Sequence, residues 1–220
     1  MRVIITGAAG ALGTACVQAF ADAGHAVAGI VRRHNPDLPA GVRQVLCADL
    51  ADPDAAAAAL REAAGDGPVD ALLHVAGGFA FAKVADSEWS QWERLGRDNL
   101  GSAVACTRAV LPLLADGAAI LCVGAAGAQV AGAGMAPYAA AKSGVARLVE
   151  ALSAELKPRR IRVNAVLPAT IDTPANRAAM PDADPAGWTS PAAIADALLF
   201  LAGPGARAIN GALVPVTNNA

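Results

Sequence analysis

The feature that most constrains this chain's fold is the alternation of short apolar segments with longer segments that favour helices. Seven apolar runs are expected to form strands, over residues 3–6, 26–31, 45–48, 69–75, 118–123, 161–167 and 212–216. The runs are predominantly apolar and not alternating, which is typical of parallel strands covered on both faces. Because helices intervene between the strands, the sequence predicts an α/β fold: a doubly wound parallel sheet of about seven strands with helices on both faces.

Capping and breaking residues place the helices between these runs. Gly24 ends the first helix, and Asp52 and Pro53 supply the N-cap and the first residue of the second. The expected helices cover residues 13–23, 53–65, 87–114 in two pieces, 137–156 and 191–202. Residues 168–190 form a long connection. No repeat or linker divides the chain, so residues 1–220 are expected to form a single domain.

Composition argues against several classes of function. Hydrophobic residues make up 55% of the 220 and charged residues 16%, which favours a large core, and the net charge of −2 without a basic run argues against a nucleic-acid partner. No apolar segment is long enough to span a bilayer, and the N-terminus lacks a signal-peptide pattern. Four cysteines without metal-type spacing favour buried reduced thiols, no metal site and a cytoplasmic location.

A glycine-rich loop follows the first predicted strand and holds Gly7, Gly10, Ala11, Leu12 and Gly13. Glycine permits the tight turn and lets the backbone approach a pyrophosphate, which binds at the N-terminus of the next helix. The spacing is G-x-x-G-x-x-G rather than G-x-G-x-x-G. A tight turn would need glycines without any ligand, but the position in the first βα unit favours binding of a dinucleotide. The chain is therefore expected to be a Rossmann-type fold.

The end of the second predicted strand bears on the choice between the two nicotinamide cofactors. An acidic residue there binds the ribose hydroxyls, whereas arginine accommodates a 2′-phosphate. Here Val31 is followed by Arg32 and Arg33, with no carboxylate. The guanidinium group suits phosphate by charge and geometry. The alternative is a pair of solvated loop arginines; the pattern favours NADPH over NADH.

Tyr138 and Lys142 are the most reactive pair of side chains in an otherwise alanine-rich segment. The i,i+4 spacing places them on one face of a helix. A lysine ammonium favours the phenolate, so we expect a lowered tyrosine pKa and a tyrosine that exchanges protons with a reacting atom. Taken alone, the pair fits an ordinary surface helix better than an active site, and only the rest of the chain reverses that preference.

The motifs together resemble the short-chain dehydrogenase/reductase family over nearly the whole chain. Similar segments are residues 6–13, 48–50, 98–101, 138–142, 161–168, 200–202 and 209–211. This resemblance implies that Tyr138 donates a proton, that Lys142 binds the nicotinamide ribose, and that Asn99 holds a water in a proton relay. It also implies cofactor contacts at Asp49 and Leu50 for the adenine, at Ala76 and Gly77, and at Pro168 and Thr170 beside the nicotinamide.

The chain departs from the family pattern at the site where a substrate carbonyl is normally oriented. The family has a serine at the position of Ala125, and residues 123–129 contain no hydroxyl at all. Gln129 is the one polar side chain nearby. After the fourth strand, His74, Val75 and Ala76 replace the usual Asn-Asn-Ala; His74 is expected to be structural.

Within the family, several segments resemble dihydropteridine reductase. These are residues 10–13, 16–20, 75–79, 124–125, 137–142, 166–177, 180–184 and 188–189. The acidic residue of that enzyme is absent at Val31, so the resemblance bears on the substrate pocket more than on the cofactor. Phe79, Tyr138, Met180 and Trp188 are the candidate substrate contacts. For Phe79, Met180 and Trp188, simple packing or an ordinary loop position is the alternative, and Trp89 and Trp92 are expected to pack.

The sequence thus predicts an NADPH-dependent oxidoreductase that reduces a quinonoid dihydropterin or a similar flat heterocycle by hydride transfer. The alternatives are a carbonyl or 3-oxoacyl reductase and, in another class, a non-catalytic NADP-binding regulatory protein. The partner is a small-molecule substrate, with neither nucleic acid nor membrane. The family resemblance implies a homodimer or homotetramer through helices around residues 100–115 and 138–156.

Overall fold

A computed structural model describes residues 1–218 and contains one seven-stranded, all-parallel sheet of order β3-β2-β1-β4-β5-β6-β7. The strands are β1 (Arg2–Thr6), β2 (Ala26–Val31), β3 (Arg43–Leu46), β4 (Val69–His74), β5 (Leu114–Val123), β6 (Arg162–Pro168) and β7 (Leu213–Val216). The strand order reverses between β1 and β4, and such a reversal opens a crevice at the carboxyl ends of the strands. The predicted fold class is confirmed.

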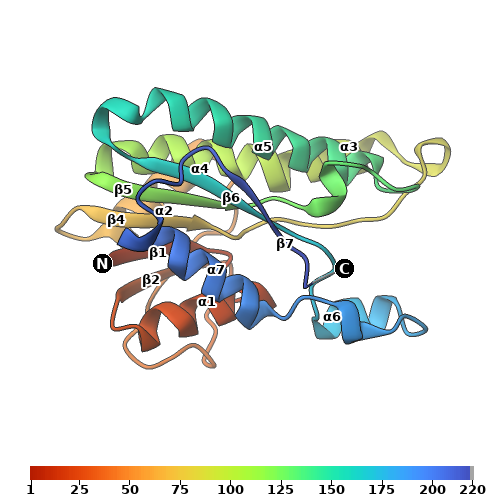
Figure 1. The fold of residues 1–220 in the computed structure, drawn as a ribbon, viewed down its shortest axis with the longest axis horizontal. Coiled ribbons are helices and arrows are strands. Elements are labelled where there is room, and N and C mark those ends of the chain that lie inside the picture. The colour runs from red at the N-terminus through yellow and green to blue at the C-terminus, as the bar shows by residue number, and fades with distance from the viewer. Residues whose placement is uncertain (219–220) are drawn as a thin grey trace.

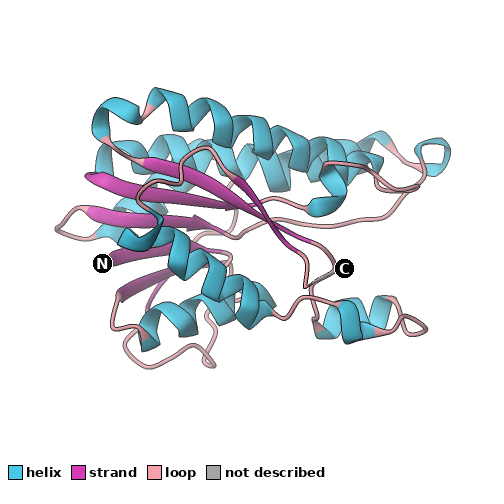
Figure 2. Cartoon of the chain, in the orientation of Figure 1, coloured by secondary structure: helices cyan, strands magenta, loops and turns pink. Residues whose placement is uncertain are grey.

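Two helical layers cover the sheet, as Figures 1 and 2 show. One face carries α1 (Ala11–Asp22) and α7 (Pro191–Ala202), packed around Phe20 and Leu198. The opposite face carries α2 (Pro53–Ala64), α4 (Ser102–Val110) and α5 (Ala136–Glu155) over a second apolar cluster. Both clusters are rich in buried strand residues, because every central strand is covered from both sides.

Several differences from the predicted elements lie at the carboxyl end of the sheet; elsewhere, β5 begins at Leu114 and not at residue 118, so the expected helix ends before residue 114. The helix expected from residue 87 begins only at Trp89, as α3 (Trp89–Leu95), and is joined to α4 by a π-helical turn, η2 (Gly96–Gly101). The long connection contains an extra short helix, α6 (Pro174–Ala179), which Thr173 caps by accepting from the Asn176 amide. Figure 1 shows α6 set apart from both helical layers, near the C-terminus.

Two expectations about single side chains also have clear outcomes. Trp89 does not pack, because it is 73% exposed, whereas Trp92 is half-buried and its indole donates to the Ser87 hydroxyl at 2.9 Å. All four cysteines are buried free thiols, as predicted. Among residues 1–218, no helix combines the length and apolarity that crossing a membrane requires.

Candidate active site

The glycine loop forms a tight turn between β1 and α1 whose geometry excludes side chains. Gly7 has φ +67°, and a Cβ there would lie 2.8 Å from the Cα of Ala76 at the end of β4. A Cβ on Gly13 would overlap the Gly7 carbonyl oxygen and lie 2.8 Å from the Cα of Ala8. The N-cap residue Gly10 offers no side chain to the first amides of α1. Backbone N–H groups left free at a helix N-terminus suit a phosphate, so the turn fits a dinucleotide.

The predicted adenine-side residues lie at the carboxyl ends of neighbouring strands. Arg32 and Arg33 follow β2, are exposed, and form no ion pair within residues 1–218. The Asp49 carboxylate, after β3, accepts from the Ala51 amide at 2.9 Å and forms an ion pair with Arg97 of η2. Sequence reasoning missed Arg97. The only signal for it was its position two residues before Asn99.

Tyr138 and Lys142 lie one turn apart on α5, as predicted, but their electrostatics differ from the prediction. The Lys142 ammonium donates to the Val123 carbonyl at the end of β5, at 2.8 Å, and lies 6.0 Å from the centroid of the Tyr138 ring. Burial lowers the pKa of Lys142 to about 8 and raises the pKa of Tyr138 to about 12. The expected lowering of the tyrosine pKa is therefore wrong for this state, because desolvation of the phenol outweighs the neighbouring charge.

Asn99 is buried in η2 and braces the chain after β4. Its amide nitrogen donates to the carbonyls of Gly78 and Leu95, both at 3.0 Å, and its oxygen accepts from the Gly78 amide at 3.2 Å. A Cβ on Gly77 would lie 2.6 Å from the Asn99 oxygen and 3.3 Å from the Lys142 nitrogen. The structure thus brings Asn99, Lys142 and Gly77 together. π-Helical turns of this kind are frequent at functional sites.

Residues 123–129 carry no hydroxyl in place of the serine that is absent at Ala125. Ala125 is buried, and the hydroxyl of Ser143 on α5 donates to the Ala128 carbonyl at 2.9 Å. Gln129 is exposed. A cavity of about 510 Å³ borders Ala125, Gln129 and Lys142 but not Tyr138, so it lies beside the reacting group and not over it.

Tyr138 forms an aromatic pair with Phe79. The ring of Phe79, from the loop after β4, meets the Tyr138 ring edge-on, with centroids 4.9 Å apart and planes at 78°. Phe79 is nevertheless 55% exposed. Phe81 lies against Gly134, which has φ +76°, and the Ala82 amide donates to the Gly134 carbonyl at 2.9 Å. Further exposed apolar side chains are Val84, Trp89, Val130 and Met180.

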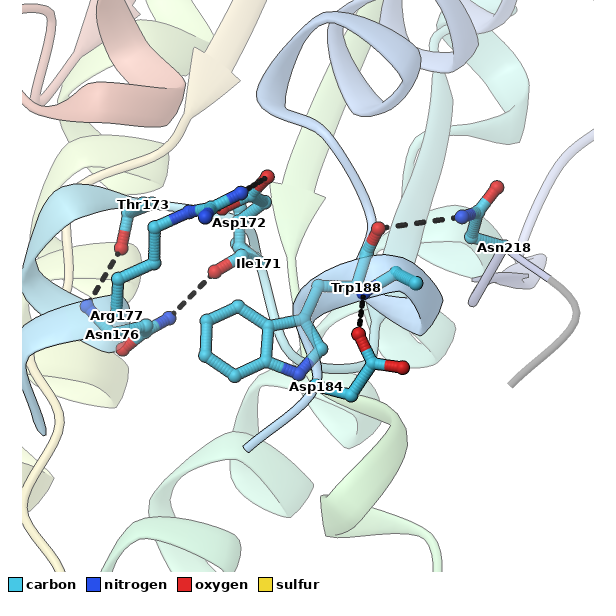
Figure 3. Close-up of polar contacts among 9 residues, drawn as sticks. Ile171, Asp172, Thr173, Asn176, Arg177, Asp184, Trp188 and Asn218 are labelled. Atoms are coloured by element: carbon cyan, nitrogen blue, oxygen red, sulfur yellow. Dashed lines mark hydrogen bonds and ion pairs between the residues drawn. The ribbon is translucent and has the colours of Figure 1, made fainter. Parts of the chain in front are cut away.

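The segment after β6 carries the other predicted contacts. Pro168 ends β6, and the Thr170 carbonyl accepts from the Thr189 amide at 2.9 Å. Figure 3 shows how this segment is held: Arg177 pairs with Asp172, Asn176 donates to the Ile171 carbonyl, and Asn218 donates to the Trp188 carbonyl. Met180 and Trp188 lie on this segment. Phe79 is the predicted substrate residue that the structure places against Tyr138.

His74 lies at the end of β4 in a buried polar network, in keeping with its predicted structural role. Its Nδ1 is 3.0 Å from the Thr6 hydroxyl and its Nε2 is 3.2 Å from the Ser102 hydroxyl. Burial, reinforced by the charge of Lys142, lowers the pKa of His74 to about 3. Sequence reasoning missed Ser102; a lone hydroxyl on the core face of a helix was its only signal.

This low pKa predicts a specific acid sensitivity. In the unfolded chain a histidine binds a proton near pH 6.5, so between about 6.5 and about 3 the unfolded chain holds one proton more than the fold. Stability is therefore fully present above about pH 6.5 and decreases as the pH falls through that window. Between about pH 7.5 and 5, a His74→Asn protein should lose about 2 kcal/mol less unfolding free energy than the parent. Urea unfolding at both pH values measures this; equal losses would mean that His74 is not held neutral.

Comparisons with a family profile, with curated proteins and with solved structures all match this chain to dehydrogenases and reductases. The profile of a family described as enoyl-(acyl carrier protein) reductase matches residues 7–218. A cis-4-hydroxycyclohexanecarboxylate dehydrogenase of Sinomonas cyclohexanicum is 31% identical, over 97% of this chain and 93% of its own. A short-chain dehydrogenase/reductase of Serratia marcescens superposes with a TM-score of 0.88 at 27% identity, covering 99% of this chain and 97% of its own. A 3-ketoacyl-(acyl-carrier-protein) reductase of Brucella melitensis, in complex with NADH, superposes with a TM-score of 0.85 at 25% identity. The match covers 97% of this chain and 95% of that protein's chain.

Proposed function

Because the chain belongs to the short-chain dehydrogenase/reductase family of NAD(P)-dependent oxidoreductases, we propose that it uses NADPH to reduce a flat, electron-poor ring, with a quinonoid dihydropterin as the leading substrate. The observation that carries this proposal is the pairing of an aromatic side wall, Phe79 against Tyr138, with the absence of a hydroxyl at Ala125. None of the relatives described above is named a dihydropteridine reductase, so the pterin is a proposal from residues of this chain.

The residues of the candidate site have separate roles in the proposed reaction. A bound nicotinamide cofactor supplies the hydride. The Gly7–Gly13 turn would receive its phosphates, and Lys142 would hold the ribose. The Tyr138 phenol, with its pKa raised to about 12, keeps its proton at neutral pH and can donate it to the reduced product. Phe79 presents the face or edge of a ring to a flat substrate, and aromatic pairs of this kind contribute about 0.5–1.5 kcal/mol beyond burial.

We expect tighter binding of NADPH than of NADH. Arg32 and Arg33 are exposed at the end of β2, so their positive charges can attract a 2′-phosphate. Val31 offers no carboxylate that would repel it. Arg32→Ala with Arg33→Ala should narrow the affinity gap by weakening NADPH selectively. Fluorescence titration of both cofactors measures this. The matched control removes two other exposed arginines, Arg108→Ala with Arg207→Ala, and should leave the gap unchanged. Equal dissociation constants in the parent would refute the preference.

The absent hydroxyl predicts a substrate preference. A simple ketone needs its oxygen held and polarised, whereas a quinonoid dihydropterin is already electron-poor and has several polar ring atoms. We expect Ala125→Ser to raise kcat/KM for a ketone more than kcat/KM for a quinonoid dihydropterin. The ratio of the two kcat/KM values should shift towards the ketone by about tenfold or more. Ala126→Ser, one residue further along the same turn, is the control. An equal effect of Ala125→Ser on both substrates would mean that this position does not orient the carbonyl.

The second candidate function is reduction of a carbonyl or 3-oxoacyl compound, and the named activities of the relatives favour it. Strong turnover of ketones or 3-oxoacyl esters by the parent, without pterin activity, would select it. A non-catalytic NADP-binding protein is the third possibility. Binding of NADPH without oxidation by any acceptor would select that, although Asn99, Tyr138 and Lys142 are all present and grouped.

A further inference from the structure

A single hydrogen-bonded chain runs through the core beneath the candidate active site. The Ala76 amide lies 3.3 Å from the Thr6 hydroxyl, which lies 3.0 Å from Nδ1 of His74. Nε2 of His74 lies 3.2 Å from the Ser102 hydroxyl, which lies 2.7 Å from the Asp98 carbonyl. Thr6, His74 and Ser102 are each at most 3% exposed. The chain thus links β1, β4 and α4 without solvent.

The Asp98 carbonyl, which can only accept, and the neutral imidazole of His74 fix the direction of every bond. The Ala76 amide donates to the Thr6 oxygen, and the Thr6 hydroxyl keeps one proton, which goes to the nitrogen of His74 that carries no hydrogen. The Asp98 carbonyl can only accept, so Ser102 donates to it and accepts from Nε2–H. His74 is therefore a neutral imidazole in the Nε2–H tautomer, accepting at one nitrogen and donating at the other.

Each end of the chain supports a different half of the site. Ala76 is the residue packed over the Gly7 turn, where a Cβ on Gly7 would lie 2.8 Å from the Ala76 Cα. Asp98 lies in the π-helical turn η2, directly before Asn99, which braces Gly78 through two hydrogen bonds. One end thus supports the dinucleotide turn and the other supports the turn that carries Asn99.

We propose that His74 is a positioning residue that couples the glycine turn to the Asn99 turn, holding the cofactor-binding and proton-transfer halves of the site in register. Its effect on turnover rests on the proposed reductase function. Its effects on cofactor binding and on the mobility of η2 do not depend on that function.

Two substitutions separate the two halves of the chain. His74→Asn keeps an acceptor oxygen near the position of Nδ1, for Thr6, and loses the donor to Ser102. His74→Gln keeps a donor near the position of Nε2 and loses the acceptor for Thr6. We expect His74→Asn to leave the NADPH dissociation constant within about twofold and to speed amide hydrogen exchange over residues 96–102. We expect His74→Gln to weaken NADPH about 2- to 12-fold, the range for one neutral hydrogen bond, with little change in that exchange.

Ser102→Ala should speed exchange over residues 96–102 at least as much as His74→Asn, because it removes the bond to the Asp98 carbonyl as well as the bond to His74, and the double variant should be no worse than Ser102→Ala alone. Where an acceptor turns over, His74→Asn should lower kcat more than it raises KM. A purely structural His74 predicts instead that both variants lose thermal stability and shift NADPH binding and exchange together. That result, or no change in either variant, overturns the proposal.

A measurement on the parent keeps the proposal testable if the variants fail to fold. Nitrogen-15 NMR of the histidine rings should find one ring locked in the Nε2–H tautomer and not titrating above about pH 5. An Nδ1–H tautomer for His74, or titration of its ring near pH 6.5, would contradict the hydrogen-bond directions described above. If the parent binds NADPH but oxidises none of it, the proposed function fails while the binding, exchange and NMR arms still decide the role of His74.

Discussion

Tyr138→Phe is expected to lower kcat by about 10²–10⁴-fold, the usual contribution of a general acid, while leaving the NADPH dissociation constant within about twofold. Phenylalanine keeps the ring that meets Phe79 edge-on at 4.9 Å and removes only the hydroxyl. Loss of rate without loss of cofactor binding therefore isolates proton donation. Stopped-flow turnover and fluorescence titration measure the two quantities.

Lys142→Ala is the companion variant and should damage both quantities. The Lys142 ammonium is buried beside Gly77 and donates to the Val123 carbonyl, so its removal takes away a charge at the expected ribose position and leaves that carbonyl unpaired. The control is Lys157→Ala, a lysine outside the site in the turn after α5. If Tyr138→Phe turned over at the parent rate, the tyrosine would have no part in the mechanism.

Gly13→Ala should have the second-largest effect, a loss of about 3 kcal/mol in unfolding free energy or failure to fold. The new Cβ would overlap the Gly7 carbonyl and lie 2.8 Å from the Ala8 Cα, and backbone cannot move aside as a flexible side chain can. The turn that receives the cofactor would open, so NADPH binding should be lost too. Chemical denaturation and cofactor titration give both quantities.

Gly10→Ala is the matched control for that prediction. Its Cβ would meet the Gly7 carbonyl at 3.4 Å, close to ordinary contact, so the unfolding free energy should change by less than about 1 kcal/mol. We nevertheless expect weaker NADPH binding, because the added methyl lies at the N-cap of α1 where phosphate must approach. Equal stability of the Gly13→Ala and parent proteins would mean that the turn is not packed as described.

Most of the sheet is predictable from the sequence, because its signal is local. Each strand contains a short, mostly apolar run, and capping pairs such as Ser190-Pro191 mark helix starts without knowledge of the fold. The π-helical turn η2 was not predictable in this way. It is stabilised by partners distant in sequence, including the Asn99 bonds to Gly78. The helix α6 is short, and local contacts such as the ion pair between Asp172 and Arg177 hold it. It has no hydrophobic periodicity from which it could be predicted.

The shared helix face of Tyr138 and Lys142 and the glycine turn were predictable from the sequence, but the arrangement of charges in the candidate site was not. The spacing of Tyr138 and Lys142 gave their common helix face, and glycine positions gave the turn. The sign of the tyrosine pKa shift depends on how deeply the phenol is buried, which the sequence does not state. Likewise the Asp49 ion pair with Arg97 and the bonds of His74 join segments far apart in sequence. Such pairings exist only once the sheet has formed.

The most direct test of the central claim is NADPH oxidation by the purified protein, measured against quinonoid dihydropterin, quinones, simple ketones and 3-oxoacyl esters in one panel. The account predicts turnover that is highest with the quinonoid dihydropterin or another flat, electron-poor ring, and largely abolished by Tyr138→Phe. NADPH oxidation confined to ketones and 3-oxoacyl esters would contradict the proposed substrate class. An absence of oxidation with every acceptor would contradict the proposed reductase itself.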